Sequence, residues 1–284
     1  MATFSVRPAP FPPELELPEF SEAGKQLLSR LDSASSLVVA GVAGSGKTVL
    51  ALAAMQQLRK QGDKVRGLVP SRLRADYLNT SRCARSLPIA RPFITPSALA
   101  FQVLQQFAIN RRQPLREPVL LTGSEEEARI RELLEKIDAP WPSYINAELR
   151  SSDYFCSELR SLFATCAHWG LSAQDLDELG RERKVAQWQA GAVILSQYEP
   201  SFKDNKWDAA RMQDRAARLL QNWEQDAALL EAPLLPDWIV ADDLQDCPAS
   251  TIRMLREMGK RGTKIFALFN PKVAAETFRG GYPS

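Results

Sequence analysis

The sequence predicts an α/β fold in which a parallel sheet carries helices on both faces and is interrupted by an all-helical insertion. Short apolar runs alternate with helical stretches from about residue 21, and this alternation lapses between about residues 110 and 205. Apolar runs of strand type then return at residues 237–241 and 264–269. Such alternation is typical of parallel sheets, because each parallel strand needs a crossover, usually a helix, before the next.

The distribution of proline and of strand signals predicts where the chain divides. Residues 1–20 hold Pro8, Pro10, Pro12, Pro13 and Pro18, a density that opposes helix and sheet, so we expect an extended lead-in. The α/β domain is expected to comprise residues 21–109 and 206–284, with the helical insertion at residues 110–205.

Within the α/β domain, we expect strands at residues 37–40, 65–69 and 92–95, with helices at residues 47–60 and 72–85. In the insertion, Ser124 and Glu127 have capping-box spacing and predict a helix over residues 124–137. Apolar residues at three- and four-residue spacing predict a second helix that ends near Gly170. Further helices are expected over residues 188–198 and 207–230.

Residues 41–48 match the phosphate-binding pattern G-x-x-x-x-G-K-[ST]. An apolar run precedes the match and a helical stretch follows it, which is the context that this motif requires. Glycines let successive backbone N–H groups face phosphate oxygens, and a helix N-terminus adds partial positive charge. Lys47 is expected to contact the β- and γ-phosphates, and the Thr48 hydroxyl to ligate Mg²⁺. The expected binding residues are Gly41, Ala43, Gly44, Ser45, Gly46, Lys47 and Thr48.

A second motif follows the apolar run at residues 238–241, where the chain continues into Asp242 and Asp243. A phosphate-loop protein that hydrolyses nucleoside triphosphates needs a carboxylate there to hold Mg²⁺. We assign that role to Asp242. Asp243 is the candidate to orient and deprotonate the attacking water.

Composition excludes several classes of function. The chain has 284 residues, of which 45% are hydrophobic, and a formal net charge of +2, so any nucleic-acid contact needs a local basic surface. The scattered four cysteines and the single histidine give little support to a zinc site or a Cys/His pair. The sequence has neither a secretory signal nor an apolar run long enough to cross a membrane, so we expect a cytoplasmic protein without a membrane partner.

The order of motifs resembles the first motor domain of superfamily 1 DNA helicases of the UvrD/Rep type. The residues 242–246 read Asp-Asp-Leu-Gln-Asp, similar to that family's Asp-Glu-x-Gln-Asp. The resemblance implies a RecA-like P-loop NTPase fold, ATP and Mg²⁺ as cofactors, and hydrolysis coupled to translocation on single-stranded DNA in repair or recombination. It adds Gln245 to the catalytic residues and implies that Gln26 reads the adenine base.

Residues 68–72 and 93–101 resemble the two family segments that contact single-stranded DNA, and residues 278–281 resemble the end of the family's third motif. The resemblance implies that the DNA-contacting residues are Pro70, Ser71, Thr95, Ser97, Phe278 and Arg279. Arginines that follow residues 70–71 are consistent with phosphate contacts and equally with a solvated helix face.

The insertion resembles the motor subunits of the actinobacterial helicase-nuclease AdnAB, which implies DNA ends as a substrate and a partner motor or nuclease subunit. Two departures predict impaired catalysis: Asp243 replaces a glutamate, and Val273 stands where the family has a phosphate-sensing glutamine. Residues 1–284 also lack the second RecA-like domain, so we expect this chain alone to hydrolyse ATP poorly. There are two alternatives. One is a degenerate subunit with a structural role in a helicase-nuclease, and the other is a small-molecule kinase or nucleotide switch.

Overall fold

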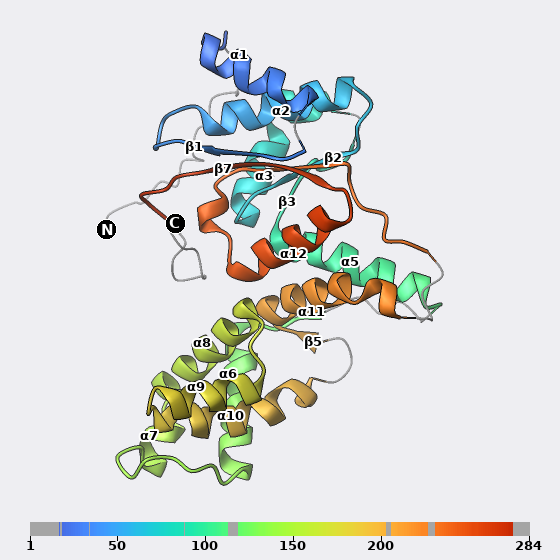
Figure 1. Cartoon of the computed structure of the whole chain (residues 1–284). Helices are drawn as coiled ribbons and strands as arrows, with labels where there is room; N and C mark the ends of the chain where they lie inside the picture. Colours follow the sequence, from blue (N-terminus) through green and yellow to red (C-terminus); the bar gives the residue numbers. More distant parts are fainter. Residues whose placement is uncertain are drawn as a thin grey trace, which may run out of the picture.

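The chain folds around one parallel sheet, shown in Figure 1. The computed structural model describes Leu17 and residues 19–33, 35–87, 89–112, 119–202, 206–226 and 231–274. The five strands lie in the order β1-β7-β6-β2-β3, and every neighbouring pair is parallel. This confirms the predicted α/β class and is consistent with a RecA-like fold. The strands are β1 (Leu37–Ala40), β2 (Val65–Leu68), β3 (Phe93–Ile94), β6 (Trp238–Ala241) and β7 (Lys264–Phe269).

The central strand β6 explains why the sheet is parallel and covered on both faces. All four of its residues are buried, including Trp238 on one face and Ile239 on the other. A strand that is apolar at every position must bury both faces, which is the pattern of parallel sheets between helices. Because all strands run the same way, the loops after β1, β2, β3, β6 and β7 meet at one edge of the sheet.

Helices cover both faces, and each face has its own apolar core. On one face Met55, Leu58 and Phe266 are buried among the helices α1, α2, α3 and α4. On the other face, which α5, α11 and α12 cover, Leu99, Met212 and Met254 of these helices pack in a core with Ile239 of the sheet. The helices have the following bounds: α1 (Glu22–Ser29), α2 (Lys47–Lys60), α3 (Arg72–Thr80), α4 (Arg82–Arg85), α5 (Pro96–Asn110), α11 (Ala209–Gln221) and α12 (Ala249–Lys260).

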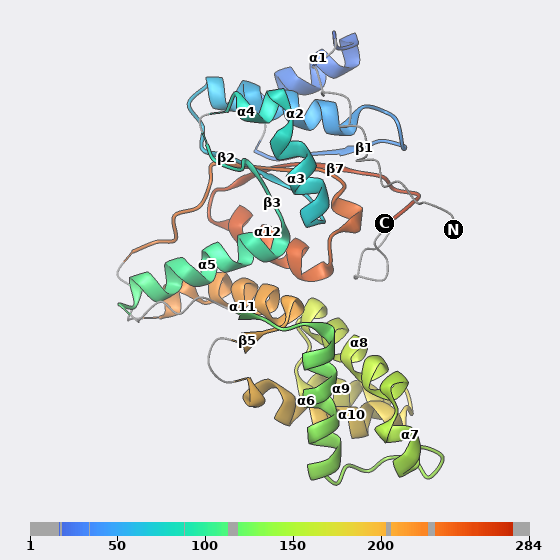
Figure 2. The ribbon, with the colours of Figure 1, turned by 180° about the vertical axis from the view of Figure 1, so that it is seen from behind.

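The insertion forms a separate group of helices below α5 and α11 (Figures 1 and 2). It has its own core, in which Ile130, Phe163 and Tyr198 are buried. Its helices are α6 (Gly123–Lys136), α7 (Ala147–Ser151), α8 (Asp153–Trp169), α9 (Ala173–Glu182) and α10 (Ala186–Tyr198). Short 3₁₀ turns occupy Arg30–Asp32, Glu199–Ser201, Trp223–Gln225 and Leu244–Asp246.

The expectation that the insertion is purely helical was wrong at its base. There β4 (Val119–Leu120) pairs in parallel with β5 (Lys206–Trp207). These strands are too short for a periodic pattern, and they form because the two ends of the insertion leave the α/β domain side by side. Trp207 therefore lies in a strand, and the following helix ends at Gln221 rather than near residue 230.

Two helix boundaries also differ from prediction, in each case because of a side-chain cap. The predicted helix at residues 72–85 is divided at Ser81, whose hydroxyl accepts from the Ala84 N–H at 3.2 Å. The capping box of α6 uses Thr122 and Glu125 rather than Ser124 and Glu127. Both candidate boxes have the same spacing, so the sequence pattern alone does not choose between them.

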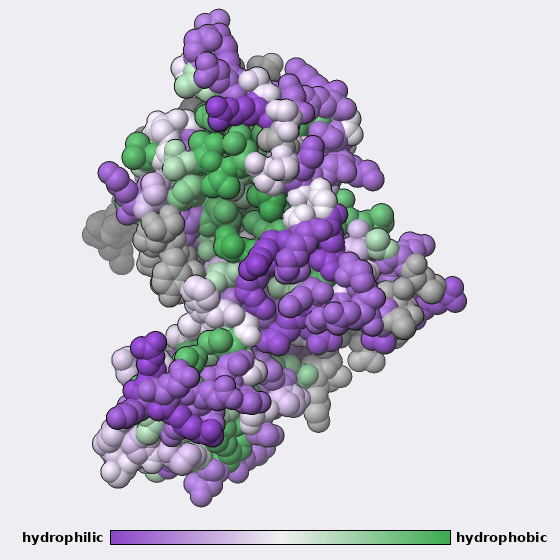
Figure 3. All heavy atoms as spheres, viewed as in Figure 1, coloured by the Kyte–Doolittle hydropathy of each residue, from purple (hydrophilic) through white to green (hydrophobic). Residues whose placement is uncertain are grey.

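An apolar surface is exposed at the edge strand β1 and the loop that follows it. Figure 3 shows a hydrophobic area beside α12 on the α/β domain. Val38 on β1 is 64% exposed, and Val42 in the following loop is 56% exposed. Trp169, at the end of α8, is also exposed, at 53%. Within the described ranges, no helix has the length and apolar character needed to cross a membrane.

A buried polar cluster joins the insertion to the α/β domain. Arg211 on α11 lies over the Tyr198 ring, with its guanidinium carbon 4.1 Å from the ring centroid, and its Nε is 3.2 Å from Asp208 Oδ2. The Tyr198 hydroxyl donates to Glu126 on α6 at 3.5 Å. Burial and the nearby Asp208 carboxylate raise the pKa of Glu126 from 4.5 to about 7.

This raised pKa predicts a pH-dependent penalty from Glu126. Its folded-state pKa exceeds the ordinary value, so stability is greatest while the carboxyl is protonated and falls as the pH rises from about 4.5 through about 7. Glu126→Gln should therefore increase the free energy of unfolding at pH 8.5 by about 1–3 kcal/mol and much less at pH 5. Urea denaturation at both pH values measures this. Glu135→Gln, on the exposed side of the same helix, is the control, and equal effects of Glu126→Gln at both pH values would contradict the prediction.

Candidate phosphate- and metal-binding site

The loop between β1 and α2 has a backbone that requires its glycines. Gly44 and Gly46 have φ angles of +77° and +81°, in the left-handed region that other residues rarely adopt. At Gly41 a Cβ atom would lie 2.6 Å from the Ser45 hydroxyl. The predicted residues Ala43, Gly44, Gly46, Lys47 and Thr48 line a cleft of about 500 Å³, and Gly41, Ser45, Gly46 and Lys47 line a second cleft of about 380 Å³.

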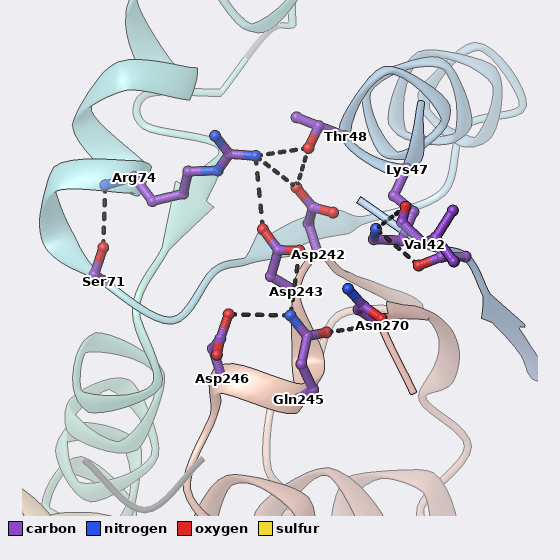
Figure 4. A network of polar contacts seen from close by, with 11 residues as sticks. Val42, Lys47, Thr48, Ser71, Arg74, Asp242, Asp243, Gln245, Asp246 and Asn270 are labelled. Atoms are coloured by element: carbon purple, nitrogen blue, oxygen red, sulfur yellow. Dashed lines mark hydrogen bonds and ion pairs between the residues drawn. The ribbon is translucent and has the colours of Figure 1, made fainter. Parts of the chain in front are cut away.

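Lys47 is turned back onto this loop. Its Nζ donates to the carbonyl oxygens of Gly41 at 3.0 Å and Val42 at 2.9 Å (Figure 4). The carbonyl groups are uncharged dipoles, so they attract the ammonium group less strongly than negatively charged phosphate oxygens would. An anion in the cleft would therefore compete favourably for Lys47.

Asp242 follows β6 directly and meets Thr48 from the start of α2. The Thr48 hydroxyl donates to Asp242 Oδ2 at 2.7 Å, although these residues are far apart in the sequence. Asp242 is completely buried, and its Oδ1 has no hydrogen-bond partner within the described structure. Burial, followed by repulsion from Asp243, raises the pKa of Asp242. A buried carboxylate with an unused oxygen favours a nearby cation, because a positive charge offsets the cost of burial.

Asp243 has a left-handed backbone, with φ of 53° and ψ of 45°. Aspartate tolerates this conformation better than most residues, because its short polar side chain can hydrogen-bond locally. Its Oδ1 accepts from Gln245 Nε2 at 3.4 Å, and its side chain borders the larger cleft. The carboxylate therefore lies beside the cleft but is engaged with its own loop.

Gln245 connects the acidic loop to the adjacent strand β7. Its Oε1 accepts from the backbone N–H of Asn270 at 2.8 Å, and its Nε2 donates to Asp246 at 3.0 Å. Asn270 immediately follows β7 and is 7% exposed. These contacts give Gln245 a structural role at the cleft, and the catalytic role that the family resemblance implies for it stays a prediction.

Arg74 completes the cluster and was not assigned to this site from the sequence. It extends from α3, and its Nη2 donates to the Thr48 hydroxyl at 2.7 Å (Figure 4). The same nitrogen lies 3.5 Å from Asp242 Oδ2 and 3.6 Å from Asp243 Oδ2. The sequence placed Arg74 only within a basic cluster, and its position three residues after the helix cap Ser71 is the sole local signal.

The donor atoms fit a hard divalent cation. In the described ranges, no group of three or more His, Cys, Asp or Glu side chains is arranged to hold a metal. Thr48 and Asp242 supply only oxygen atoms, and Mg²⁺ characteristically takes one or two protein oxygens, with phosphate oxygens and waters completing its shell. The site therefore fits Mg²⁺ delivered together with a phosphate ligand, rather than a metal held by protein alone.

Gln26, the predicted base-reading residue, lies away from the lining of both clefts. Its side chain is exposed on α1. The neighbouring positions Phe20, Gly24 and Leu27 line the smaller cleft instead. The assignment of Gln26 to the adenine base remains a prediction.

The predicted DNA-contacting residues cap helices at the same edge of the sheet. Ser71 accepts from the Arg74 N–H at 3.3 Å and follows the half-buried Pro70, and Thr95 accepts from the Ala98 N–H at 3.2 Å. Thr95 and Ser97 line a groove of about 500 Å³ together with Arg72, Arg91 and Phe101. Phe278 and Arg279 lie outside the described residues.

Sequence analysis did not assign Arg74 or Asn270 to the site. It identified Val273 only as the residue that stands where the similar helicases have a phosphate-sensing glutamine. Val273 borders the larger cleft and is 59% exposed. It has no polar atom on its side chain, so it can make only apolar contact there.

No family model matches the chain, and no curated protein matches its sequence.

The role of Gln245 leads to a stability prediction. Gln245→Ala would leave the buried Asn270 N–H without its acceptor, so the free energy of unfolding should fall by about 1–3 kcal/mol. Urea denaturation of both proteins measures the change. Gln221→Ala, at an exposed position at the end of α11, is the matched control. A loss no larger than that of the control would show that Gln245 does not hold the loop.

Proposed function

We propose that the chain binds ATP with Mg²⁺ and acts as a helicase-type motor domain. The observation that carries this proposal is the 2.7 Å hydrogen bond between Thr48 and Asp242. It joins the end of a glycine-rich phosphate loop to a buried carboxylate on a separate strand. Phosphate-loop NTPases hold Mg²⁺ through a loop Ser or Thr and such a carboxylate.

Each residue has a defined part in this proposal. Backbone N–H groups of residues 43–48 and the positive end of α2 bind the phosphates, and Lys47 leaves the carbonyls of Gly41 and Val42 for phosphate oxygens. Thr48 and Asp242 would hold Mg²⁺, which would supply positive charge next to the phosphates. Asp243 accepts the proton of the attacking water. The cleft of about 500 Å³ has room for these groups.

Hydrolysis by this chain is proposed to be weak. Asp243 is shorter than the glutamate of the similar helicases, and here it also accepts from Gln245. Val273 cannot hydrogen-bond the γ-phosphate. These two features support the second candidate, a catalytically impaired motor subunit that acts structurally beside an active motor or nuclease partner.

The DNA part of the proposal rests on the groove beside Thr95 and Ser97. Arg72 and Arg91 supply positive charge there, while Phe101 and Ile94 supply apolar surface for a base. A positively charged groove and aromatic side chains on which bases stack are the usual components of single-strand binding, and Phe101 is the aromatic residue here. We propose single-stranded DNA or DNA ends as the ligand and the cytoplasm as the location.

The nucleotide site is tested by Lys47→Ala. Loss of the ammonium group should weaken binding of a fluorescent ATP analogue in the presence of Mg²⁺ by about tenfold or more, since a charged hydrogen bond to phosphate is lost. Equilibrium titration measures this. Lys60→Ala removes an exposed lysine from the opposite end of the same helix and should not change affinity. Absence of saturable binding by the wild-type chain would refute the proposed function.

The groove is tested by Arg72→Gln. This change should weaken binding of an oligothymidylate a few-fold at low salt and reduce the slope of log K against log salt by about one. Fluorescence anisotropy at several salt concentrations measures both quantities. Lys60→Gln is the control, because that residue lies at the end of α2 remote from the groove. Unchanged DNA affinity, with nucleotide binding intact, would favour a function without DNA contact at this groove.

A further inference from the structure

Arg74 is the only side chain from α3 that reaches the phosphate and metal cluster in the described structure. Its Nη2 lies within 2.7–3.6 Å of oxygen atoms from Thr48, Asp242 and Asp243. Its Nε is buried and has no hydrogen-bond partner within the described residues. The cluster therefore contacts the guanidinium group only through Nη2.

Nη2 of Arg74 occupies space beside the two oxygen atoms that a divalent cation would need, 2.7 Å from Thr48 Oγ1 and 3.5 Å from Asp242 Oδ2. A cation that binds Thr48 and Asp242 must lie close to both side-chain oxygens, which is where Nη2 lies (Figure 4). Two positive groups cannot share that place, because their mutual repulsion and their sizes exclude it. Arg74 also supplies the positive charge that the buried Asp242 would otherwise lack.

Arg74 belongs to the first turn of a helix whose cap is a predicted DNA contact. The Ser71 hydroxyl accepts from the backbone N–H of Arg74 at 3.3 Å, and Ser71 follows β2 after Val69 and Pro70. The side chain of Arg74 thus engages the metal-binding residues while its backbone holds the start of α3.

We propose that Arg74 competes with the divalent cation for Thr48 and Asp242, and that its displacement on metal binding changes the first turn of α3 next to Ser71. This inference rests on the proposed nucleotide site. Arg74 is a positioning residue here: it neutralises the acidic cluster before the cation enters and couples the entry of the cation to the adjacent edge of the sheet.

The test measures metal affinity rather than catalysis. Binding of Mn²⁺ in the presence of a saturating non-hydrolysable ATP analogue is followed by electron paramagnetic resonance. Arg74→Gln removes the competing charge and should tighten Mn²⁺ binding by about tenfold, the effect of one charged hydrogen bond. Arg74→Lys retains the charge and should lie nearer to the wild type. Lys60→Gln, with the same charge change at the exposed far end of α2, should leave the Mn²⁺ affinity unchanged.

A second measurement distinguishes competition from loss of folding. Without metal and nucleotide, Arg74→Gln should lower the melting temperature, because Asp242 loses its positive neighbour. Addition of Mn²⁺ and the analogue should remove that difference. Unchanged or weaker Mn²⁺ binding by Arg74→Gln, with binding of the analogue intact, would overturn the inference alone. Failure of the wild-type chain to bind the analogue would overturn the nucleotide site and this inference with it.

Discussion

The parallel alignment of β1, β7 and β6 is the constraint on which the site depends. β7 pairs with β1 on one side and with β6 on the other, in registers that bring Ala40 beside Phe269 and Ala241 beside Ala267. The loops that follow these strands therefore emerge at the same edge. Thr48 can reach Asp242 only because this alignment holds, and the burial of both faces of β6 keeps the alignment in place.

The buried carboxylate after β6 carries an electrostatic cost that the surrounding side chains partly offset. Asp242 and Asp243 are consecutive, and burial and mutual repulsion both disfavour the charge on Asp242. Thr48 donates to Asp242, and Arg74 brings a positive charge to both carboxylates. The same oxygen atoms suit a hard cation, so the cluster is compatible with the proposed Mg²⁺ site.

Two regions connect this edge to the rest of the molecule. Gln245 attaches the acidic loop to Asn270 at the end of β7, so both sides of the larger cleft belong to one hydrogen-bonded unit. At the other end of the molecule, Arg211 stacks on Tyr198 and pairs with Asp208 where α11 meets the insertion. Because α11 also packs in the core beneath the sheet, the insertion is anchored to the α/β domain through a buried helix.

Local sequence was sufficient for the fold class, the five strands of the main sheet and the glycine-rich loop after β1, because apolar periodicity and glycine spacing act over a few residues. It also located Asp242, since an apolar strand that ends in carboxylates is a local pattern. Three other features depended on which segments lie next to one another in the folded chain. They are the cap at Thr122, the pairing of Val119–Leu120 with Lys206–Trp207, and the exposure of Trp169. Arg74 had no distinguishing local signal, because its contacts are to residues distant in sequence that only the folded sheet brings within hydrogen-bonding distance.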